Sequence, residues 1–485
     1  MSQSETVNQV RRNTIISTMS LFFQSGYSAG LGLAANLVLT IHLSRASFGI
    51  YGTVLSIISI LNYFSDIGLA ASLIQKKDIS NDDVKTTFSV QQLMVITIIV
   101  LCFTITPFVK NWYNLPDEGI HLYWALLLSF FLSSLKTIPS VFLERKIEFQ
   151  KIVTVQIIEN TFFYFSVMIF ALLGFSLESF TIAVLLRAII GVIAMYRISF
   201  WKPEIGISLS SLKQLLSFGV PFQLSSFLAL FKDDLITIFL AKIVGFDTLG
   251  SILWAKKWAE APIRIVMDNI TRVLFPLIAR FQHNKEKVGL LTDKLLTYQT
   301  ALIAPAIVGM ALIMSEVVEV LPKYSKWESA LPLFYIFCFS SFIVSLCAPF
   351  VNIFNALGKA KLTFIYMLIW TIIIWIFTPF LTFYTGSIGF PLAHMIVSIS
   401  YFIILIQAKK YFHFHFLKSI YPFIISALLM LISVFILRRS VSFSGIPAII
   451  FMIGAGSTIY FFSVTYIFKI SFFQIVQSIL HKNTN

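Results

Sequence analysis

The chain contains few charged residues. Asp, Glu, Lys and Arg make up only 12% of its 485 residues, whereas about 25% is usual for a soluble globular domain. Hydrophobic residues make up 58%, and the mean hydropathy is +0.87. This composition excludes an ordinary soluble protein and indicates an integral membrane protein. The net charge of +14 would suggest nucleic acid in a soluble protein, but basic cytoplasmic loops explain it here, so no nucleic-acid partner is expected.

Cysteine and histidine are also scarce. Cys102, Cys338 and Cys347 all fall in apolar stretches, and their spacing is not typical of a disulfide framework or a metal site. His413 and His415 form a short His-Phe-His sequence, which we interpret as part of a basic loop. We therefore expect neither a metal ion nor a cofactor.

Fourteen apolar stretches are long enough to cross a membrane, which takes about 20 residues per helix. The first follows Arg11 and Arg12, and it is too long for the apolar region of a signal peptide. The stretches are residues 15–41, 48–74, 87–109, 120–142, 152–175, 179–196, 216–241, 248–275, 295–320, 330–355, 362–385, 388–407, 419–437 and 446–468. The sequence therefore predicts an all-α polytopic membrane protein with about 14 transmembrane helices.

The Lys and Arg residues between these stretches lie mostly on one side of the predicted membrane. By the positive-inside rule this side is cytoplasmic, and the bias predicts that both termini lie there. The longest polar stretches, around 197–215 and 276–294, are too short for a folded domain. The membrane-embedded part is therefore expected to carry the function.

A weak internal repeat occurs at an offset of about 200 residues. Pro139 ends the fourth stretch as Pro349 ends the tenth. The repeat predicts two six-helix lobes, 1–205 and 206–410, followed by a two-helix segment with a cytoplasmic tail, 411–485. Repeated halves are typical of transporters that move one bundle against the other around a central site.

A ladder of charges interrupts the eighth stretch. Lys256, Glu260, Arg264, Asp268 and Arg272 recur at every fourth residue, which places them on one helix face with opposite signs adjacent. A charge at the bilayer centre costs about 2.5–3.5 kcal/mol on insertion scales, so such residues usually face a protein interior or a water-filled cavity. The ladder is the first candidate for the working surface. The alternative is a row of ion pairs that only supports the helix.

Five segments carry recognisable motifs. They are Ser47–Lys77, Thr86–Leu93 (TTFSVQQL), Ile138–Ile152 (IPSVFLERKIEFQKI), Phe218–Phe281 and Phe354–Phe364 (FNALGKAKLTF). Together they resemble the polysaccharide transporter, or O-antigen flippase, family of the multidrug/oligosaccharidyl-lipid/polysaccharide superfamily, over residues 10–410. The segment Ile138–Ile152 is most similar to the branch of colanic-acid-type exporters.

The resemblance implies two six-helix lobes, an extra helix pair and alternating access. It also implies that the protein is a transporter and not an enzyme. Its cargo would be a polyprenyl-pyrophosphate-linked oligosaccharide, such as an O-antigen or capsule repeat unit, moved from the cytoplasmic to the periplasmic leaflet of a bacterial inner membrane. Besides membrane lipids, the implied partners are a glycan polymerase and an initiating sugar transferase.

Two alternatives remain open at this point. A multidrug or cation exporter of the same superfamily would need a cavity dominated by acidic residues. A membrane glycan polymerase or transferase would usually present acidic catalytic motifs near the outer face.

A pyrophosphate inside a membrane needs cationic partners, because desolvating an ion is prohibitive. Arg264 is the first candidate, because a guanidinium binds phosphate in a bidentate manner. The further candidates for binding the pyrophosphate or sugar are Lys256, Lys257, Arg272, Lys232 and Arg187.

Acidic residues within the apolar stretches are candidates for ion coupling or gating, because a buried carboxylate can carry a proton. They are Asp66, Glu159, Asp233, Asp234, Glu260 and Asp268. Pro262 is predicted to bend its helix, either as a gating hinge or as a static kink. The first stretch has no charged residue between Asn13 and Ile41. Its polar residues are candidates either for contacts with sugar hydroxyls or for helix packing, of which we favour packing.

Overall fold

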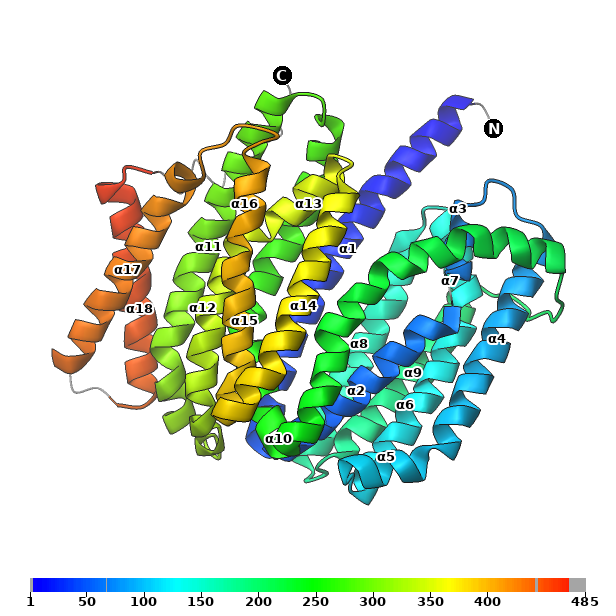
Figure 1. Ribbon diagram of the computed structural model, residues 1–485, viewed down its shortest axis with the longest axis horizontal. Helices are drawn as coiled ribbons and strands as arrows, with labels where there is room; N and C mark the ends of the chain where they lie inside the picture. Colours follow the sequence, from blue (N-terminus) through cyan, green and yellow to red (C-terminus); the bar gives the residue numbers. More distant parts are fainter. Residues whose placement is uncertain (1–2, 67, 441–443, 471–485) are drawn as a thin grey trace. The chain divides into compact units, whose positions relative to one another are not determined.

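The computed structural model describes residues 3–66, 68–440 and 444–470. Within these ranges the side chains of some residues, among them Asp66, Asp268 and Arg272, lie outside the description. Every regular element of the described residues is a helix, without any strand (Figure 1). The predicted all-α class is confirmed.

Eleven helical segments among the described residues are long and apolar enough to cross a membrane. One of them, Leu230–Met267, overlaps the predicted stretches 216–241 and 248–275, which both lie in the helix Leu209–Arg280, and another, Lys361–Ala408, contains the stretches 362–385 and 388–407. The predicted first stretch lies in α1 (Gln3–His42). The described helices therefore account for the predicted stretches, and the polytopic membrane fold is confirmed.

The chain divides into two compact units, Met1–Gly250 and Ser251–Asn485. The first holds α1, α2 (Arg45–Asp66), α3 (Leu69–Gln75), α4 (Asn81–Thr104), α5 (Thr106–Tyr113), α6 (Asp117–Leu135), α7 (Thr137–Arg145), α8 (Phe149–Leu172) and α9 (Glu178–Ile198). The long α10 (Leu209–Arg280) runs across the boundary. The second holds α11 (Lys285–Val320), α12 (Leu331–Cys347), α13 (Pro349–Ala356), α14 (Ala360–Thr385), α15 (Gly389–Ser400), α16 (Phe402–Ala408), α17 (Phe416–Ser440) and α18 (Ile446–Phe462). The predicted division follows the internal repeat and differs from these two units. It consists of the lobes 1–205 and 206–410 and the segment 411–485, and it stays a prediction.

The core of the first unit forms around α8 and α9. Helix α8 packs against α1 and α9, and α9 also packs against α6. Fully buried residues of this core include Val54, Leu122, Val167 and Ala183. Between α1 and α8, Tyr27 Oη lies 2.8 Å from Thr161 Oγ1, and Asn160 Nδ2 donates to Ser28 Oγ at 2.9 Å. These polar residues of α1 thus connect two helices.

Two membrane stretches of the first unit are broken helices. The stretch 48–74 breaks between α2 and α3 at Gly68, whose φ is 77°, and the stretch 120–142 breaks between α6 and α7 at Lys136. The guanidinium of Arg145 donates to four backbone carbonyls at the end of α3, those of Leu73, Ile74, Lys76 and Lys77. These bonds satisfy carbonyls that a helix end leaves without partners.

The second unit repeats this pattern. Helix α12 breaks at Ala348 before α13, as α6 breaks before α7. Helix α15 packs against α14 and α12, as α9 packs against α8 and α6. The starts of the matching helices α8 and α14, and of α9 and α15, lie about 210 residues apart. The internal repeat therefore has a structural counterpart.

The last two helices belong to the second unit. Helices α17 and α18 both pack against α11. Arg438 at the end of α17 forms an ion pair with Glu316 of α11, and Tyr460 Oη of α18 donates to the Ala301 carbonyl at 2.9 Å. The pair is therefore attached to α11 by polar contacts in addition to its apolar core.

Candidate functional site

Three charged side chains meet inside the first unit. Lys136 lies at the break between α6 and α7, Glu159 lies in α8, and Arg187 lies in α9. The Lys136 ammonium contacts Glu159 Oε1 directly, and Arg187 Nε lies 4.0 Å from Glu159 Oε2. The Glu159 side chain is 9% exposed, whereas that of Arg187 is 46% exposed. This first-unit cluster is thus a buried acid between two bases, one of which presents exposed donors.

The local structure explains how the cluster fits. Because α6 ends at Leu135, Lys136 occupies a turn between two helices rather than a position within one. On α9, Gly191 faces the carboxylate, and a Cβ atom added there would lie 1.9 Å from Glu159 Oε1. A glycine, which has no Cβ, therefore leaves the space that the acid occupies.

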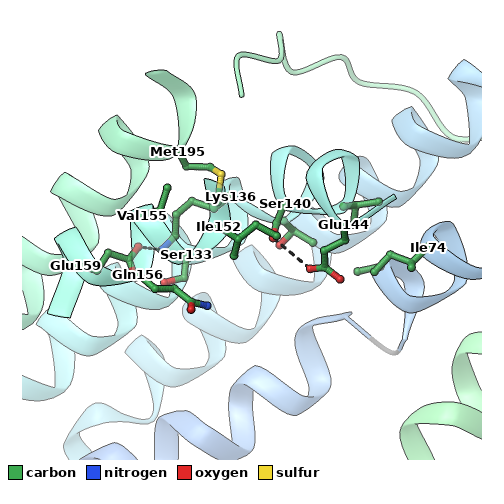
Figure 2. Close-up of a pocket in the computed structure, with 13 residues that line it drawn as sticks. Ile74, Ser133, Lys136, Ser140, Glu144, Ile152, Val155, Gln156, Glu159 and Met195 are labelled. Atoms are coloured by element: carbon green, nitrogen blue, oxygen red, sulfur yellow. Dashed lines mark hydrogen bonds and ion pairs between the residues drawn. The ribbon is translucent and has the colours of Figure 1, made fainter. Parts of the chain in front are cut away.

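The larger of two cavities at this cluster has a volume of about 300 Å³. Figure 2 shows Lys136 and Glu159 pointing toward each other at one end of it, with Gln156 beside them. At the other end Ser140 Oγ donates to Glu144 Oε1 at 3.3 Å. The cavity therefore has a polar group at each end, and it is large enough for several water molecules.

The smaller cavity has a volume of about 180 Å³ and is lined by Arg187 and Asn62, among others. Ser133, Lys136 and Glu159 line both cavities. The cluster therefore lies where two polar-lined spaces meet within one unit.

The repeat does not conserve this charge. The positions of the second unit that match the cluster are Ala348, Trp370 and Ser398. There Trp370 stacks on Tyr401 with ring centroids 3.7 Å apart, and Ser398 is fully buried. Because the same helix packing is achieved with uncharged residues, the charges of the first-unit cluster are not a requirement of the architecture.

The described part of the predicted ladder forms a second group of charges, in α10 within the second unit. Lys256 Nζ lies 3.9 Å from Glu260 Oε1, and Arg264 Nη2 lies 3.0 Å from Glu260 Oε2. The Arg264 side chain is 73% exposed. The side chains of Asp268 and Arg272 lie outside the described residues. This second-unit cluster contains the ion pairs that the alternative interpretation expected, and it again places one acid between two bases.

The other predicted residues of α10 do not belong to these two clusters. Lys257 is exposed. Lys232 Nζ lies 3.9 Å from Asp233 Oδ1, its sequence neighbour, while Asp234 is half-buried. The side chain of Asp66 lies outside the described residues.

The backbone of α10 is interrupted at Gly245, which has φ 75° and ψ 166°. Helical structure continues through Pro262, which is buried. The kink in α10 therefore lies between the predicted seventh and eighth stretches, where a loop was expected. The hinge role of Pro262 stays a prediction.

The structure also shows residues to which sequence reasoning gave no role. Lys136 stands out in the sequence only as a lone lysine in an apolar stretch, and Glu144 only as one charge in a motif. Gly191 carried no signal, because its role depends on the neighbouring helix.

The basic loop before α17 is held by an acid of α11. His415 Nδ1 lies 3.1 Å from Asp293 Oδ2 of α11, and the His415 backbone N–H donates to Asp293 Oδ1 at 2.7 Å. Across the residues that the structure describes, no group of three or more His, Cys, Asp or Glu side chains is placed to hold a metal ion.

Comparison with known proteins places these features in context. A family model described as "Polysaccharide biosynthesis protein" matches residues 38–332. The lipopolysaccharide biosynthesis protein WzxC of Escherichia coli (strain K12) is 26% identical over 395 residues, which cover 78% of this chain and 77% of that protein. The succinoglycan biosynthesis transport protein ExoT of Rhizobium meliloti (strain 1021) is 22% identical over 344 residues, which cover 70% of this chain and 68% of that protein.

Solved structures share the fold. The lipid II flippase MurJ in an inward closed conformation superposes with a TM-score of 0.75 and 13% identity, over 94% of this chain and 99% of that chain. An inward-facing multidrug resistance transporter of the MATE family, in the MOP superfamily, gives a TM-score of 0.60 and 12% identity, over 80% of this chain and 95% of that chain. At these identities the likeness shows the fold alone.

Proposed function

Because the chain belongs to the polysaccharide biosynthesis protein family, whose model matches residues 38–332, we propose that it is a flippase for a polyprenyl-pyrophosphate-linked oligosaccharide. The cargo would be an O-antigen or capsule repeat unit, moved by alternating access from the cytoplasmic to the periplasmic leaflet of a bacterial inner membrane with both termini cytoplasmic. A glycan polymerase and an initiating sugar transferase would act beside it.

One observation carries the proposal: each unit holds an acid between two bases within its membrane-embedded helices. In the first unit Glu159 lies between Lys136 and Arg187, and in the second Glu260 lies between Lys256 and Arg264. Each cluster therefore carries a formal excess of one positive charge. A positive charge in a low-dielectric site attracts an anion more strongly than it would in water.

The exposed base of each cluster is an arginine. The lysine side chains are less exposed, at 16% for Lys136 and 21% for Lys256, whereas those of Arg187 and Arg264 are 46% and 73% exposed. A guanidinium offers a planar pair of donors that matches two phosphate oxygens. We assign pyrophosphate binding to Arg187 with Lys136 in the first unit and, separately, to Arg264 in the second, with Lys232, Lys257 and Arg272 as further candidates.

Transport of such a headgroup requires no covalent step. The protein must replace water around the phosphates, because transfer of a bare ion into hydrocarbon is prohibitive. An inside-negative membrane potential favours outward movement of an anion by about 2.3 kcal/mol per charge per 100 mV. Glu159 and Glu260 partly neutralise the bases of their clusters and so weaken binding of the headgroup. Weaker binding is compatible with release of the headgroup on the periplasmic side.

The structural likeness to MATE transporters makes a multidrug or cation exporter the second candidate. A cation-binding cavity would be dominated by acids, whereas both described clusters contain more bases than acids. The cluster charges therefore favour an anionic cargo over a cationic drug.

Complementation of a deletion strain tests the proposal. We expect Arg264→Ala, at wild-type membrane levels, to lose surface glycan and to accumulate the lipid-linked repeat unit, because the exposed guanidinium that meets the phosphates is missing. The matched control is Arg280→Ala, an exposed arginine in the last turn of the same helix, which should restore glycan fully. Full surface glycan in the Arg264→Ala strain would contradict the role of Arg264 in binding the cargo. Unchanged surface glycan in the deletion strain itself would contradict the proposed flippase function.

A further inference from the structure

Resting on the proposed function, we propose that Glu159 is a proton-binding counter-ion whose protonation is coupled to anion binding in the first-unit cluster. An anionic headgroup that binds Lys136 and Arg187 takes these bases from the carboxylate. Glu159 then takes up one proton and becomes neutral. The coupled event adds one anion and one proton to the unit and forms or breaks no other covalent bond.

Two bases lie against Glu159. Lys136 faces it from the break between α6 and α7, and Arg187 faces it from α9. Helix α1, which packs along α8, has no charged residue between Asn13 and Ile41. Among the other titratable groups of the neighbouring helices, Arg145 binds the carbonyls of α3, Lys151 pairs with Glu148, and Glu178 and Arg197 lie at the two ends of α9. Glu144 of α7 lines the larger cavity, and Tyr51 of α2 lines the smaller one.

Two anions cannot share one pair of bases without a penalty. A buried carboxylate beside a second negative charge, and without its own counter-ion, is stabilised by binding a proton. Glu159 is buried, and Gly191 leaves no Cβ that would hold the carboxylate away from α9. The position of the second unit that matches Glu159 is Trp370, which has no carboxylate and therefore cannot bind a proton in this way.

The larger cavity provides a route for the proton. It extends from Glu159 to Glu144, which lies in α7 just beyond the predicted membrane stretch 120–142. Burial raises the pKa of Glu144 above its ordinary value, and the hydrogen bond from Ser140 opposes this rise. Glu144 is therefore protonated more readily than an exposed glutamate, and it lies at the end of the cavity away from Glu159.

The coupling has a definite sign. Because the protonated cluster carries one more positive charge, it binds an anion more tightly, and affinity must rise as pH falls. The probe is UDP-glucose, a disubstituted pyrophosphate whose phosphates stay ionised throughout. We would measure its binding to the full chain in nanodiscs by calorimetry between about pH 6 and pH 8, in buffers of different ionisation enthalpy, so that proton uptake is counted directly.

For the wild type we expect UDP-glucose to bind about tenfold more tightly at pH 6 than at pH 8, with a net uptake of protons on binding. Glu159→Gln should bind at pH 8 as tightly as the wild type does at pH 6, without proton uptake from this site. Glu148→Gln, the same change at the start of α8 outside the cavity lining, should behave as the wild type. A wild-type pH slope and proton uptake in Glu159→Gln would overturn the coupling.

The design separates this inference from the proposed function. Absence of UDP-glucose binding by the wild type at every pH would contradict the anion site on which both rest, whereas binding with unchanged coupling in Glu159→Gln would contradict the coupling alone. Because Glu159→Gln leaves Lys136 without its partner, Lys136→Gln/Glu159→Gln is the second variant. It should bind more weakly than the wild type at low pH and take up no proton, and wild-type proton uptake by this double variant would also overturn the coupling.

Discussion

Replacing Arg187 by Gln is expected to abolish most transport while leaving the protein folded. The guanidinium is 46% exposed and lies 4.0 Å from Glu159, so its loss should cost less than about 1 kcal/mol of stability. A charged hydrogen bond to phosphate contributes about 1.5–3 kcal/mol, which corresponds to a roughly 10- to 100-fold lower transport rate. Surface glycan and lipid-linked precursor in a complemented deletion strain measure the effect.

The control for this variant is Arg197→Gln. Arg197 lies in the last turn of the same helix and is exposed, so it should retain wild-type transport. A thermal melt of each purified variant separates lost function from lost folding. Wild-type glycan with Arg187→Gln would show that the first-unit cluster takes no part in binding cargo.

Replacing Lys136 by Met is expected to give the largest loss of stability. The substitution removes the ammonium that contacts Glu159 and leaves a buried carboxylate with only the distant Arg187 as counter-ion. Breaking a buried ion pair by removing one partner costs about 3–5 kcal/mol, and Arg187 should keep the cost at the lower end of that range. The temperature of unfolding in detergent, followed by loss of soluble monomer, reports the change.

The double variant Lys136→Met/Glu159→Gln distinguishes a stabilising role from a transport role. Removing both charges eliminates the uncompensated carboxylate, so most of the lost stability should return. Transport should stay low, because a cation of the anion site is still missing. A double variant that recovers both stability and transport would reduce the pair to an ordinary structural contact.

The sequence predicted the fold well because the bilayer leaves few choices. An apolar stretch in lipid must satisfy its backbone hydrogen bonds internally, so helices were the only elements expected. The breaks in these helices were not predicted, since neither Gly68 nor Lys136 has a local pattern that distinguishes a broken span from a continuous one. The position of Lys136 inside the first unit depends on such a break.

The candidate site was predicted only in part, for a similar reason. Lys256, Glu260 and Arg264 lie four residues apart on one helix, so their pairing follows from local geometry. Lys136, Glu159 and Arg187 come from three different elements, and their meeting depends on how α8 packs against its neighbours. The sequence identified Glu159 and Arg187 as separate candidates, without any signal that one would be the partner of the other.

The most direct test of the central claim is a flipping assay in proteoliposomes. A fluorescent polyprenyl-pyrophosphate-linked oligosaccharide would be placed in both leaflets, and the fraction protected from an impermeant quencher would be followed with time. We expect wild-type protein to make the protected lipid accessible, and vesicles with Arg187→Gln/Arg264→Ala to behave as protein-free vesicles do. Protected lipid that stays protected with the wild type, or equal rates for the wild type and the double variant, would contradict the assignment of the two arginines to a lipid-linked anion.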